Sequence, residues 1–332
     1  MHAVTYEKFG KAADVLTLSE MPDVNPGSGE VRVALHRSGV NPSDVKSRAG
    51  SRPGVTAPPF PLVIPHSDGA GVIEAVGADV DPSRIGSRVW IWNGQWQRAF
   101  GTAATHITLP ATQAVALPDG VSFDTGATLG IPGLTACHAV FGGGDVAGQT
   151  LLVSGGGGTV GYLAVQLARW GGARVIATCS ARDRNRVLAA GAHVVLDYAA
   201  EDLAGQVLAA NDGAQVDRIL EVEFGINLGV DTDVIAENGT IAAYGSALEM
   251  APVLPFGPLL FKAVTIDVIL IYLLPKAERD AAIKRLHAAL TDGALTCPVE
   301  KVFALADTAH AQQAVEAGGR AGAILIDCVL KD

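Results

Sequence analysis

Apolar and polar positions alternate in short runs up to about residue 124. These runs are rich in β-branched residues and are separated by clusters of Gly and Pro. They read EVRVALHRSGV, AGVIEAVG, SRVWIW and ATHITL. Such runs, with turn residues between them, are typical of β-strands joined by irregular loops. This region therefore predicts an irregular β-barrel or sandwich.

The pattern changes near residue 125, and from Thr150 apolar runs of strand length alternate with segments of helix length. TLLVS precedes VGYLAVQLARW, RVIATCS precedes RDRNRVLAAGA, and HVVLDY, DRILEV and TIAAYG follow. Nearly continuous apolar strands are expected where helices cover both faces of a parallel sheet. Repeated strand–helix–strand units therefore predict an α/β, doubly wound parallel sheet. Helical patterns at 276–291 and 307–317 precede a last strand, GAILIDC, which we expect to return to the first domain.

Composition narrows the class of protein. The 332 residues are enough for two domains, and 49% apolar residues can bury a large core. A net charge of −10 argues against a nucleic-acid partner, since phosphate contacts need clustered Lys and Arg. The four cysteines form no C-x-x-C pair, and the apolar run at 263–274 is too short to span a bilayer. We expect a soluble cytoplasmic protein that acts on a small molecule.

Four glycines in SGGGGTVGYLAVQLARW, residues 154–170, separate the first strand of the second region from its helix. Gly156, Gly158 and Gly161 fit the pattern G-x-G-x-x-G, and Thr159 and Val160 open the helix. Glycines let the backbone approach a diphosphate closely, and a helix N-terminus attracts the anion. A flexible linker is the alternative, but the strand–helix context favours a dinucleotide-binding loop.

The residues at the end of the next strand should determine whether NAD or NADP binds. Sites for NAD usually carry Asp or Glu there to hold the ribose 2′-hydroxyl. This chain has Cys179 and Ser180 at that place, and three arginines follow within six residues. Because Arg binds phosphate through two parallel hydrogen bonds, we predict NADPH. Solvated charges at a helix start are the alternative, and Asp183 would repel a phosphate if it pointed inward.

Four motifs in this order resemble one known family. They are GVNPSDVKSRAG at 39–50, PHSDGAGVIEAVG at 65–77, LGIPGLTA at 129–136 and the glycine loop. The chain resembles the medium-chain dehydrogenase/reductase superfamily, in particular its zinc-independent quinone oxidoreductase (ζ-crystallin-like) branch. The resemblance implies a GroES-like catalytic domain at 1–124, completed by 275–332. It also implies a Rossmann coenzyme-binding domain at 125–274.

The resemblance also implies a homodimer and the absence of zinc. The family dimer pairs the edges of two coenzyme-domain sheets, and the matching segment here is TIDVILIY at 265–272. Zinc-dependent relatives use a Cys near residue 38 and a His at or near residue 67, whereas this chain has Ser38. His66 alone, without thiolate partners, makes a poor zinc site. We expect His66 to be a polar residue of a cleft wall or turn.

The resemblance implies catalytic-side roles for Asn41, Asp44 and Thr135, which would face the nicotinamide. Lys46 replaces a tyrosine that is common in the family, so a tyrosine contact is not expected there. Structural alternatives remain: a turn for Asn41 and Asp44, and a hydroxyl bonded within the helix for Thr135. The cofactor contacts implied by the resemblance are Ser180, Arg184, Tyr198, Gly245, Ser246 and Arg320. For Tyr198, packing on the sheet is an equal alternative.

The resemblance, together with the arginines that favour NADPH, implies a reductase that transfers a hydride from NADPH to a quinone or another conjugated carbonyl acceptor. An acceptor that is already electrophilic needs no metal to polarise it, whereas an unactivated ketone does. Reduction of the double bond of a 2-alkenal or enone is one alternative. A non-catalytic, crystallin-like NADPH-binding protein is an alternative of another class.

Overall fold

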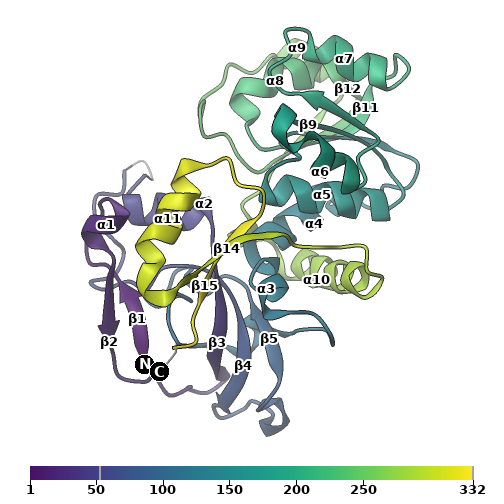
Figure 1. Cartoon of the computed structure of the whole chain (residues 1–332). Coiled ribbons are helices and arrows are strands. Elements are labelled where there is room, and N and C mark those ends of the chain that lie inside the picture. The colour runs from purple at the N-terminus through teal and green to yellow at the C-terminus, as the bar shows by residue number, and fades with distance from the viewer. Residues whose placement is uncertain (52–53, 331–332) are drawn as a thin grey trace. The chain divides into compact units, whose positions relative to one another are not determined.

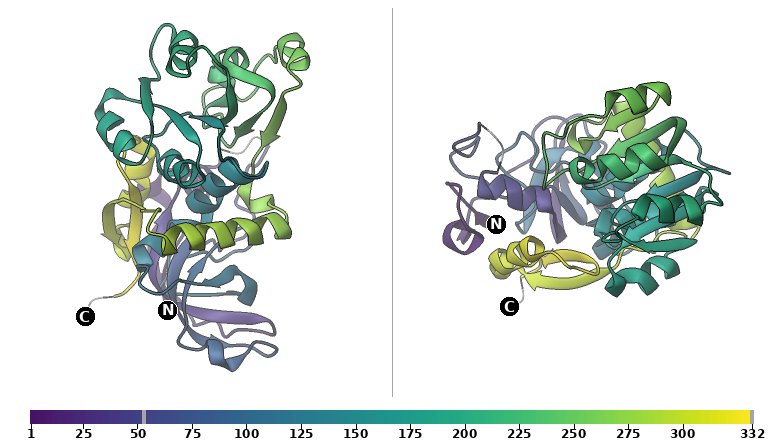
Figure 2. Two further views of the ribbon diagram at one scale, coloured as in Figure 1. Left: turned by 90° about the vertical axis from the view of Figure 1, so that its right-hand side faces the viewer. Right: turned by 90° about the horizontal axis from the view of Figure 1, so that it is seen from above.

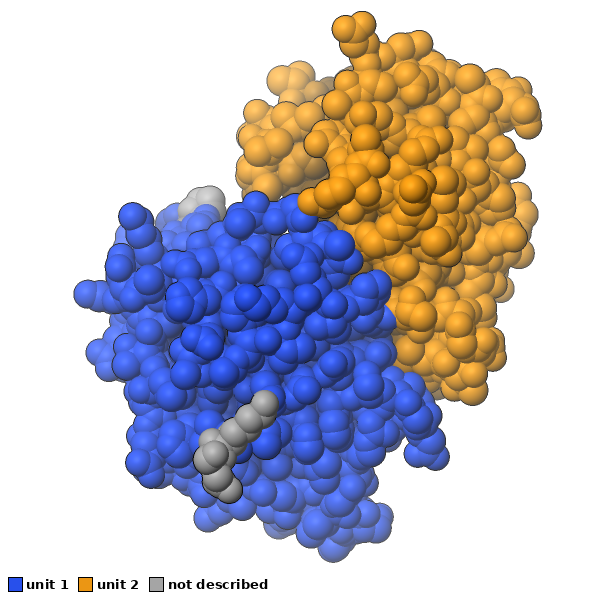
Figure 3. Space-filling view, in the orientation of Figure 1, with its two compact units in different colours: residues 1–131, 297–332 blue, residues 132–296 orange. Residues whose placement is uncertain are grey.

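The computed structural model describes residues 1–51 and 54–330 and divides into two compact units (Figures 1 and 3). Unit 1 comprises residues 1–131 and 297–332, and unit 2 comprises residues 132–296. The division predicted from the sequence, at 124 and 274, differs from these bounds because residues 125–131 belong to unit 1 and residues 275–296 belong to unit 2. Positions 331 and 332 of the predicted first domain lie outside the described residues.

Unit 1 is built around a seven-stranded sheet in the order β14-β15-β3-β4-β5-β7, with β6 pairing β3 off this path. The strands of unit 1 are β1 (His2–Thr5), β2 (Thr17–Glu20), β3 (Glu30–Val40), β4 (Asp68–Val76), β5 (Arg88–Ile91), β6 (His106–Pro110), β7 (Ala114–Ala116), β14 (Val299–Ala304) and β15 (Ala323–Asp327). Its helices are α1 (Ala12–Val15), α2 (Pro42–Ala49), α3 (Phe123–Gly126) and α11 (Thr308–Ala317). The last strand, β15, pairs antiparallel with β3, so the prediction that it returns to the first domain is confirmed.

Alternation along β3 creates the core of unit 1. Val31, Val33 and Leu35 are buried, whereas the residues between them are partly exposed. They pack with apolar residues of β4, β5, β6 and α11 in one cluster. Each such side chain stabilises the fold by about 1.5–3 kcal/mol when fully buried. The period of two in the sequence therefore becomes the two faces of the strand.

Unit 2 contains a six-stranded parallel sheet in the order β10-β9-β8-β11-β12-β13. The strands are β8 (Thr150–Val153), β9 (Arg174–Cys179), β10 (Val194–Asp197), β11 (Val216–Glu221), β12 (Ile235–Ala243) and β13 (Thr265–Val268). The helices are α4 (Leu134–Phe141), α5 (Thr159–Trp170), α6 (Arg184–Ala189), α7 (Leu203–Ala210), α8 (Phe224–Val234), α9 (Phe256–Phe261) and α10 (Lys276–Thr291). This strand order is that of the doubly wound dinucleotide-binding fold, so the predicted fold class is confirmed.

Helices cover both faces of the parallel sheet (Figures 1 and 2). α7, α8 and α9 supply apolar residues to one core cluster with the strands, whereas α5 and α10 pack on α4. Val175, Ile176 and Ala177 of β9 are all fully buried, as expected for a strand covered on both faces. Among the described residues, no helix has the length and apolar character needed to cross a membrane.

One predicted strand is shorter than expected. The segment at 265–272 was expected to be one edge strand, but β13 ends at Val268 and a 3₁₀ turn covers Ile271–Leu273. Ile269 and Ile271 are buried, whereas Val268 and Leu270 are exposed. An apolar run on its own does not distinguish a strand from a turn whose side chains cover a core.

Candidate functional site

The glycine loop lies where the strand order of unit 2 reverses. β8 has β9 on one side and β11 on the other, and Gly155–Gly158 connect it to α5. The amide of Gly156 donates to the carbonyl of Thr178, 2.8 Å away, which ties the loop to β9. Gly155 has φ +69°, a conformation that glycine adopts without a Cβ clash. Ligands of open α/β sheets bind at such a reversal point.

Gly158 and Gly161 of the motif differ in the space that the fold leaves for a side chain. A Cβ atom at Gly161 would overlap the carbonyl oxygen of Gly155, so this glycine lets α5 pack closely on the loop. A Cβ at Gly158 would meet only the Gly155 oxygen, at 3.4 Å, and therefore fits the fold. In the described chain, no side chain caps the start of α5 at Gly158. The amides of its first turn, at Thr159, Val160 and Gly161, therefore suit the diphosphate of a dinucleotide.

The end of β9 lies beside this loop, and β10 is the next strand of the sheet. Ser180 follows β9, and its hydroxyl donates to Oδ2 of Asp183 over 3.0 Å. Tyr198 follows β10, is 62% exposed, and its amide donates to the carbonyl of Cys179 at 3.4 Å. The predicted residues Ser180 and Tyr198 thus occupy neighbouring strand ends. Nη1 of Arg184 instead donates to the carbonyl of Val195, 2.5 Å away, so this guanidinium bonds to the backbone of β10.

The loops after β11 and β12 complete the same edge of the sheet. A Cβ at Gly245 would overlap the carbonyl oxygen of Val222, which explains the glycine at this position. The carbonyl of Gly245 accepts from the amide of Phe224 at 2.9 Å, and Oγ of Ser246 accepts from the amide of Gly225 at 2.9 Å. Gly245 and Ser246 therefore hold two strand-end loops together at the predicted cofactor edge.

A buried acid beneath this edge did not emerge from the sequence. Glu221, at the end of β11, is fully buried, and its Oε1 accepts from Nδ2 of Asn227 at 2.9 Å. The same Nδ2 contacts Oγ of Ser154, the first residue of the glycine loop, at 3.2 Å. Burial raises the pKa of Glu221, and burial also raises that of Asp231, with the nearby Glu221 adding to the effect. The connection of Glu221 to the glycine loop through Asn227 could not be predicted, because a single carboxyl at the end of an apolar strand breaks no sequence pattern.

In unit 1, the predicted residues Asn41 and Asp44 form a buried polar cluster at the start of α2. Oδ2 of Asp44 accepts from the amide of Asn41 at 2.8 Å, which caps the helix. Nδ2 of Asn41 donates to Oδ2 of Asp68 over 2.9 Å. Oδ1 of Asp68 accepts from the amide of Ile131 at 2.9 Å. Asp68, which the sequence did not single out, therefore orients the Asn41 amide.

Burial governs the charge of this cluster. It raises the pKa of Asp44 to about 7, against weaker opposing hydrogen bonds from Asn41 and Ser67. It raises the pKa of Asp68 well above its usual range, and the neighbouring Asp44 adds to the effect. Both carboxyl groups bond to Asn41, and two neighbouring carboxyl groups in a buried site cannot both ionise easily. The raised pKa of Asp68 and the shared burial therefore favour a cluster with at most one negative charge.

His66 lies in a second buried network of unit 1. Its Nε2 faces Nε2 of Gln312 at 3.1 Å, and its Nδ1 faces Oγ of Ser38 at 3.0 Å. Nε of Arg48 donates to Oε1 of Gln312, so the amide nitrogen of Gln312 points at the histidine. Nε2 of His66 must accept this bond, which assigns the proton to Nδ1. Burial lowers the pKa of His66 to about 3, so the ring is neutral.

This network bears on the predicted absence of zinc. Ser38 stands near the position of the cysteine ligand of zinc-dependent relatives, and its Oγ also lies 2.8 Å from Oγ1 of Thr102. A serine hydroxyl is not among the usual zinc ligands, and both nitrogens of His66 already have partners. Within residues 1–51 and 54–330, no group of three or more His, Cys, Asp or Glu side chains is arranged to hold a metal.

Thr135 and Arg320 belong to different units. Thr135 lies in the first turn of α4 in unit 2, where it is buried. Arg320 lies between α11 and β15 in unit 1, and burial lowers its pKa while Glu300 opposes this shift. The nicotinamide contact of Thr135 and the cofactor contact of Arg320 stay predictions that rest on the family resemblance.

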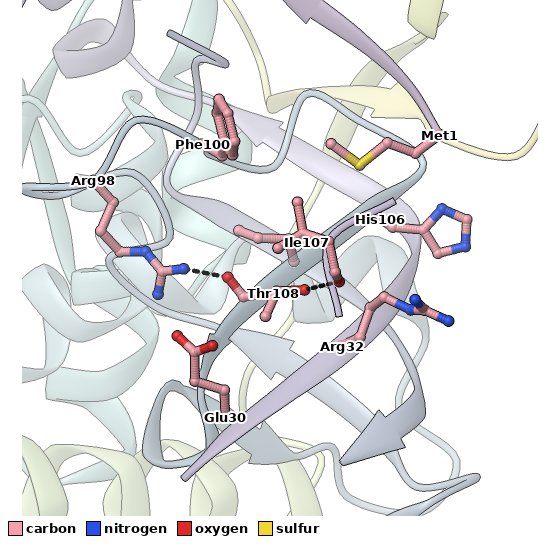
Figure 4. Close-up of a pocket in the computed structure, with 9 residues that line it drawn as sticks. Met1, Glu30, Arg32, Arg98, Phe100, His106, Ile107 and Thr108 are labelled. Atoms are coloured by element: carbon pink, nitrogen blue, oxygen red, sulfur yellow. Dashed lines mark hydrogen bonds between the residues drawn. The ribbon is translucent and has the colours of Figure 1, made fainter. Parts of the chain in front are cut away.

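A separate hollow of unit 1 is too small to be the main site (Figure 4). Its volume is about 100 Å³, whereas ligand pockets usually measure about 300–1,000 Å³. Thr108 bonds through Oγ1 to the carbonyl of Val24 at 2.7 Å, and its own carbonyl accepts from Arg98. The lining residues are Met1, Val24, Glu30, Arg32, Arg98, Phe100, His106, Ile107 and Thr108.

A glycine loop at the reversal point of a parallel sheet, joined to a β-rich unit, defines a dehydrogenase or reductase that uses a dinucleotide. Two family matches agree: the alcohol dehydrogenase GroES-like domain over residues 27–119, and the family described as zinc-binding dehydrogenase over residues 159–288. A quinone oxidoreductase of Rattus norvegicus is 31% identical over 258 residues, which cover 76% of each chain. The chain belongs to the quinone oxidoreductase family of the medium-chain dehydrogenase/reductase superfamily.

Relatives from bacteria match nearly the whole chain. A quinone oxidoreductase of Pseudomonas aeruginosa is 28% identical over 323 residues, covering 94% of this chain and 95% of the relative. A solved mycobacterial structure in complex with NADPH has a TM-score of 0.86 and 28% identity, and covers 98% of this chain and 99% of its own. The sequence-based family assignment is confirmed.

Proposed function

We propose that this chain is an NADPH-dependent reductase of quinones that works without zinc. The end of β9 supports the proposal: Ser180 follows the strand, and the next acid along the chain, Asp183, is bonded to arginines. A site for NAD would instead offer a carboxylate to the ribose. The names of the relatives support the quinone as acceptor, and the NADPH complex of a similar protein supports the cofactor.

We propose the loop and strand ends of unit 2 as the cofactor site. The amides of Thr159 and Val160 and the backbone of Gly156, Gly158 and Gly161 would hold the diphosphate. Ser180 and Tyr198 would border the adenosine ribose, and Gly245 and Ser246 would contact the nicotinamide half through their loop. Arg320 is retained as a proposed contact on the strength of the family resemblance.

The bound cofactor supplies a hydride, and the protein supplies orientation and electrostatics. We propose that Asn41 and Thr135 contact the nicotinamide side, with the Asn41 amide fixed by Asp68. Asp44, with a pKa of about 7, can hold or release a proton at its buried carboxyl group near neutral pH. A quinone is already electrophilic, so its reduction does not require a metal to polarise a carbonyl. The neutral, fully hydrogen-bonded His66 and Ser38 support the zinc-independent proposal.

We also propose a homodimer formed through the exposed edge of the parallel sheet. β13 is the last strand of its sheet, and Val268 on it is 77% exposed. Phe261, at the end of α9, is 86% exposed. Exposed apolar side chains beside a strand edge invite aggregation unless another surface covers them, so a second copy is the expected occupant. We use the name β13 edge patch for the exposed large apolar residues between β12 and α10; they are Leu248, Met250, Val253, Leu254, Phe256, Leu260, Phe261, Val268, Leu270 and Leu273.

The cytoplasm is our proposed location. The four cysteines are free, and three of them are buried. Burial raises the pKa of Cys137 to about 12, which makes this thiol unreactive. Free structural thiols are typical of a reducing compartment.

An acceptor panel tests the substrate class. Initial rates would be measured with NADPH and either simple quinones or enones, at matched concentrations. Our proposal expects quinones to be the faster acceptors. Faster turnover of enones would identify a double-bond reductase, and tight NADPH binding without turnover on either class would contradict the enzymatic assignment.

A further inference from the structure

The residues after β9 form an arginine clamp around one buried acid. We use this name for Ser180, Arg182, Asp183 and Arg186. Nη2 of Arg182 donates to Oδ2 of Asp183 at 2.8 Å, and Ser180 donates to the same oxygen at 3.0 Å. Nη2 of Arg186 lies 3.3 Å from Oδ1 of Asp183. Both carboxylate oxygens of Asp183 therefore accept hydrogen bonds from within the clamp.

The acid is ionised but not available to a ribose. Its side chain is 9% exposed. Burial alone would raise the pKa of Asp183, but hydrogen bonds from Arg182, Ser180 and Arg186 outweigh it and lower the pKa. A Cβ at Gly157 would lie 3.0 Å from the Asp183 side chain, so the acid is packed under the glycine loop. Asp183 thus acts as an anchor for arginines rather than as the acceptor of a 2′-hydroxyl.

The three arginines of this segment differ in exposure and in partners. Arg184 bonds to the carbonyl of Val195. Arg186 is 22% exposed, bonds to the carbonyl of Gly157, and stacks on the ring of Tyr162 at 4.9 Å. Arg182 is 57% exposed, although its guanidinium is already oriented by Asp183. Arg182 and Arg184 are both exposed, but Asp183 orients Arg182 at the end of β9, whereas Arg184 bonds to the backbone of β10.

The position of Arg182 suits a phosphate on the adenosine ribose. It lies two residues beyond Ser180, at the strand end where dinucleotide sites read the ribose. The next strand end is adjacent, since Asp197 pairs with Cys179 and the exposed Tyr198 follows. Three arginines and one aspartate in residues 182–186 leave an excess of positive charge. Such a site favours a phosphate over a neutral hydroxyl.

We propose that Arg182, oriented by Asp183, binds the 2′-phosphate of NADPH and selects it over NADH, whereas Arg184 has a structural role. The proposal rests on the proposed NADPH dependence and names the side chain that determines it. It replaces Arg184, which the sequence favoured, as the phosphate contact. Asp183 is a positioning residue: it acts on the phosphate only through Arg182, because a carboxylate cannot itself attract the anion.

The test is the dissociation constant of NADPH and of NADH, measured by fluorescence titration without an acceptor. R182A should weaken NADPH by about 10- to 100-fold, the usual range for losing hydrogen bonds to a charged group, and change NADH by less than about threefold. R184A is the matched control, because it removes the same charge two residues away. It should change both constants by a similar factor.

A second pair of variants tests the anchor. R182K keeps the charge but loses the planar fork, so it should bind NADPH with an affinity between those of the wild type and R182A. D183N should lower the preference for NADPH over NADH, because Arg182 loses its orientation. Thermal unfolding of each variant separates this effect from a general loss of stability, which would weaken both nucleotides together.

The affinities of the variants test the roles of Arg182 and Asp183, and the affinities of the wild-type protein test the NADPH dependence. An R182A variant with the wild-type ratio of the two constants would overturn the proposal, as would selective loss of NADPH binding in R184A. Tighter NADPH binding in D183N would show that Asp183 only repels the phosphate, which contradicts its positioning role. Equal affinity of the wild-type protein for NADPH and NADH would instead contradict the proposed function itself.

Discussion

Gly158 and Gly161 are three residues apart, but a side chain at each position has different consequences. A Cβ at Gly158 fits the fold, whereas one at Gly161 overlaps the carbonyl oxygen of Gly155. We therefore expect Gly158→Val to fold but to lose nucleotide binding, because the branched side chain fills the diphosphate cradle. Gly161→Ala should lower the free energy of unfolding by about 1–3 kcal/mol, the usual cost of overpacking.

Urea unfolding and fluorescence titration check both variants. The expected pattern is a stable Gly158→Val protein without NADPH affinity and a destabilised Gly161→Ala protein. Unchanged NADPH affinity in a folded Gly158→Val protein would contradict the assignment of the loop.

His66 provides a prediction about pH. Its pKa falls from 6.5 to about 3 on folding, so the unfolded chain binds a proton that the folded chain excludes. The contribution of His66 to stability is present above pH 6.5 and is lost as the pH falls toward 3. His66→Gln keeps an acceptor for Gln312 but cannot titrate. Between pH 6.5 and 5.0 the variant should lose less stability than the wild type, by up to about 1.4 kcal/mol per pH unit.

Chemical denaturation at the two pH values measures this difference. Parallel loss of stability in both proteins would contradict a neutral, buried His66. The raised pKa of Asp44 acts with the opposite sign, because its protonated form is favoured on folding. Its contribution is lost as the pH rises through about 7, so the comparison of wild type with variant, rather than the wild-type curve alone, is decisive.

At the residue scale, the sequence predicted positions that belong to a motif and missed those that act through tertiary contacts. The glycine loop was predictable because its spacing follows from the close approach of a helix and a strand. Asp68 and Glu221 were not, because a single buried carboxyl breaks no periodic pattern. Three arginines near one strand end could be recognised, but their partners, Asp183 for Arg182 and the carbonyl of Val195 for Arg184, depend on the fold.

At the scale of elements, buried strands gave the clearest signal. β9 was predictable because its residues are apolar on both faces, and α10 and α11 because their helical patterns extend over ten residues or more. The end of β13 was predicted too late, since Ile269 and Ile271 remain buried after the strand ends. Hydrophobicity reports burial there, whereas the hydrogen bonds to β12 define the strand.

The edge of β13 leads to a prediction about assembly. Val268→Lys places a charge on the β13 edge patch and should weaken the proposed dimer, because edge charges oppose strand pairing. Ile85→Lys is the control, since Ile85 is 52% exposed and lies in unit 1, outside the patch. Sedimentation velocity should find a dimer for the wild type and for Ile85→Lys, with more monomer for Val268→Lys. A monomeric wild-type protein would contradict the proposed dimer.

At the scale of the whole molecule, both ends of the chain build unit 1, because β15 adds to β3 beside the N-terminal strands. The sequence predicted this return but placed the boundary before α10. That helix packs on α4 of unit 2, and a contact between distant helices leaves no local mark in the sequence. The two-part organisation was therefore predictable, whereas the exact bounds depended on tertiary packing.

The central claim is that this fold transfers a hydride from NADPH to a quinone without zinc. The most direct measurement is the initial rate of NADPH and of NADH oxidation by metal-chelated protein with one simple quinone. We expect turnover that survives chelation, with a higher kcat/KM for NADPH than for NADH. Loss of activity on chelation with recovery on adding zinc, or a preference for NADH, would contradict the account.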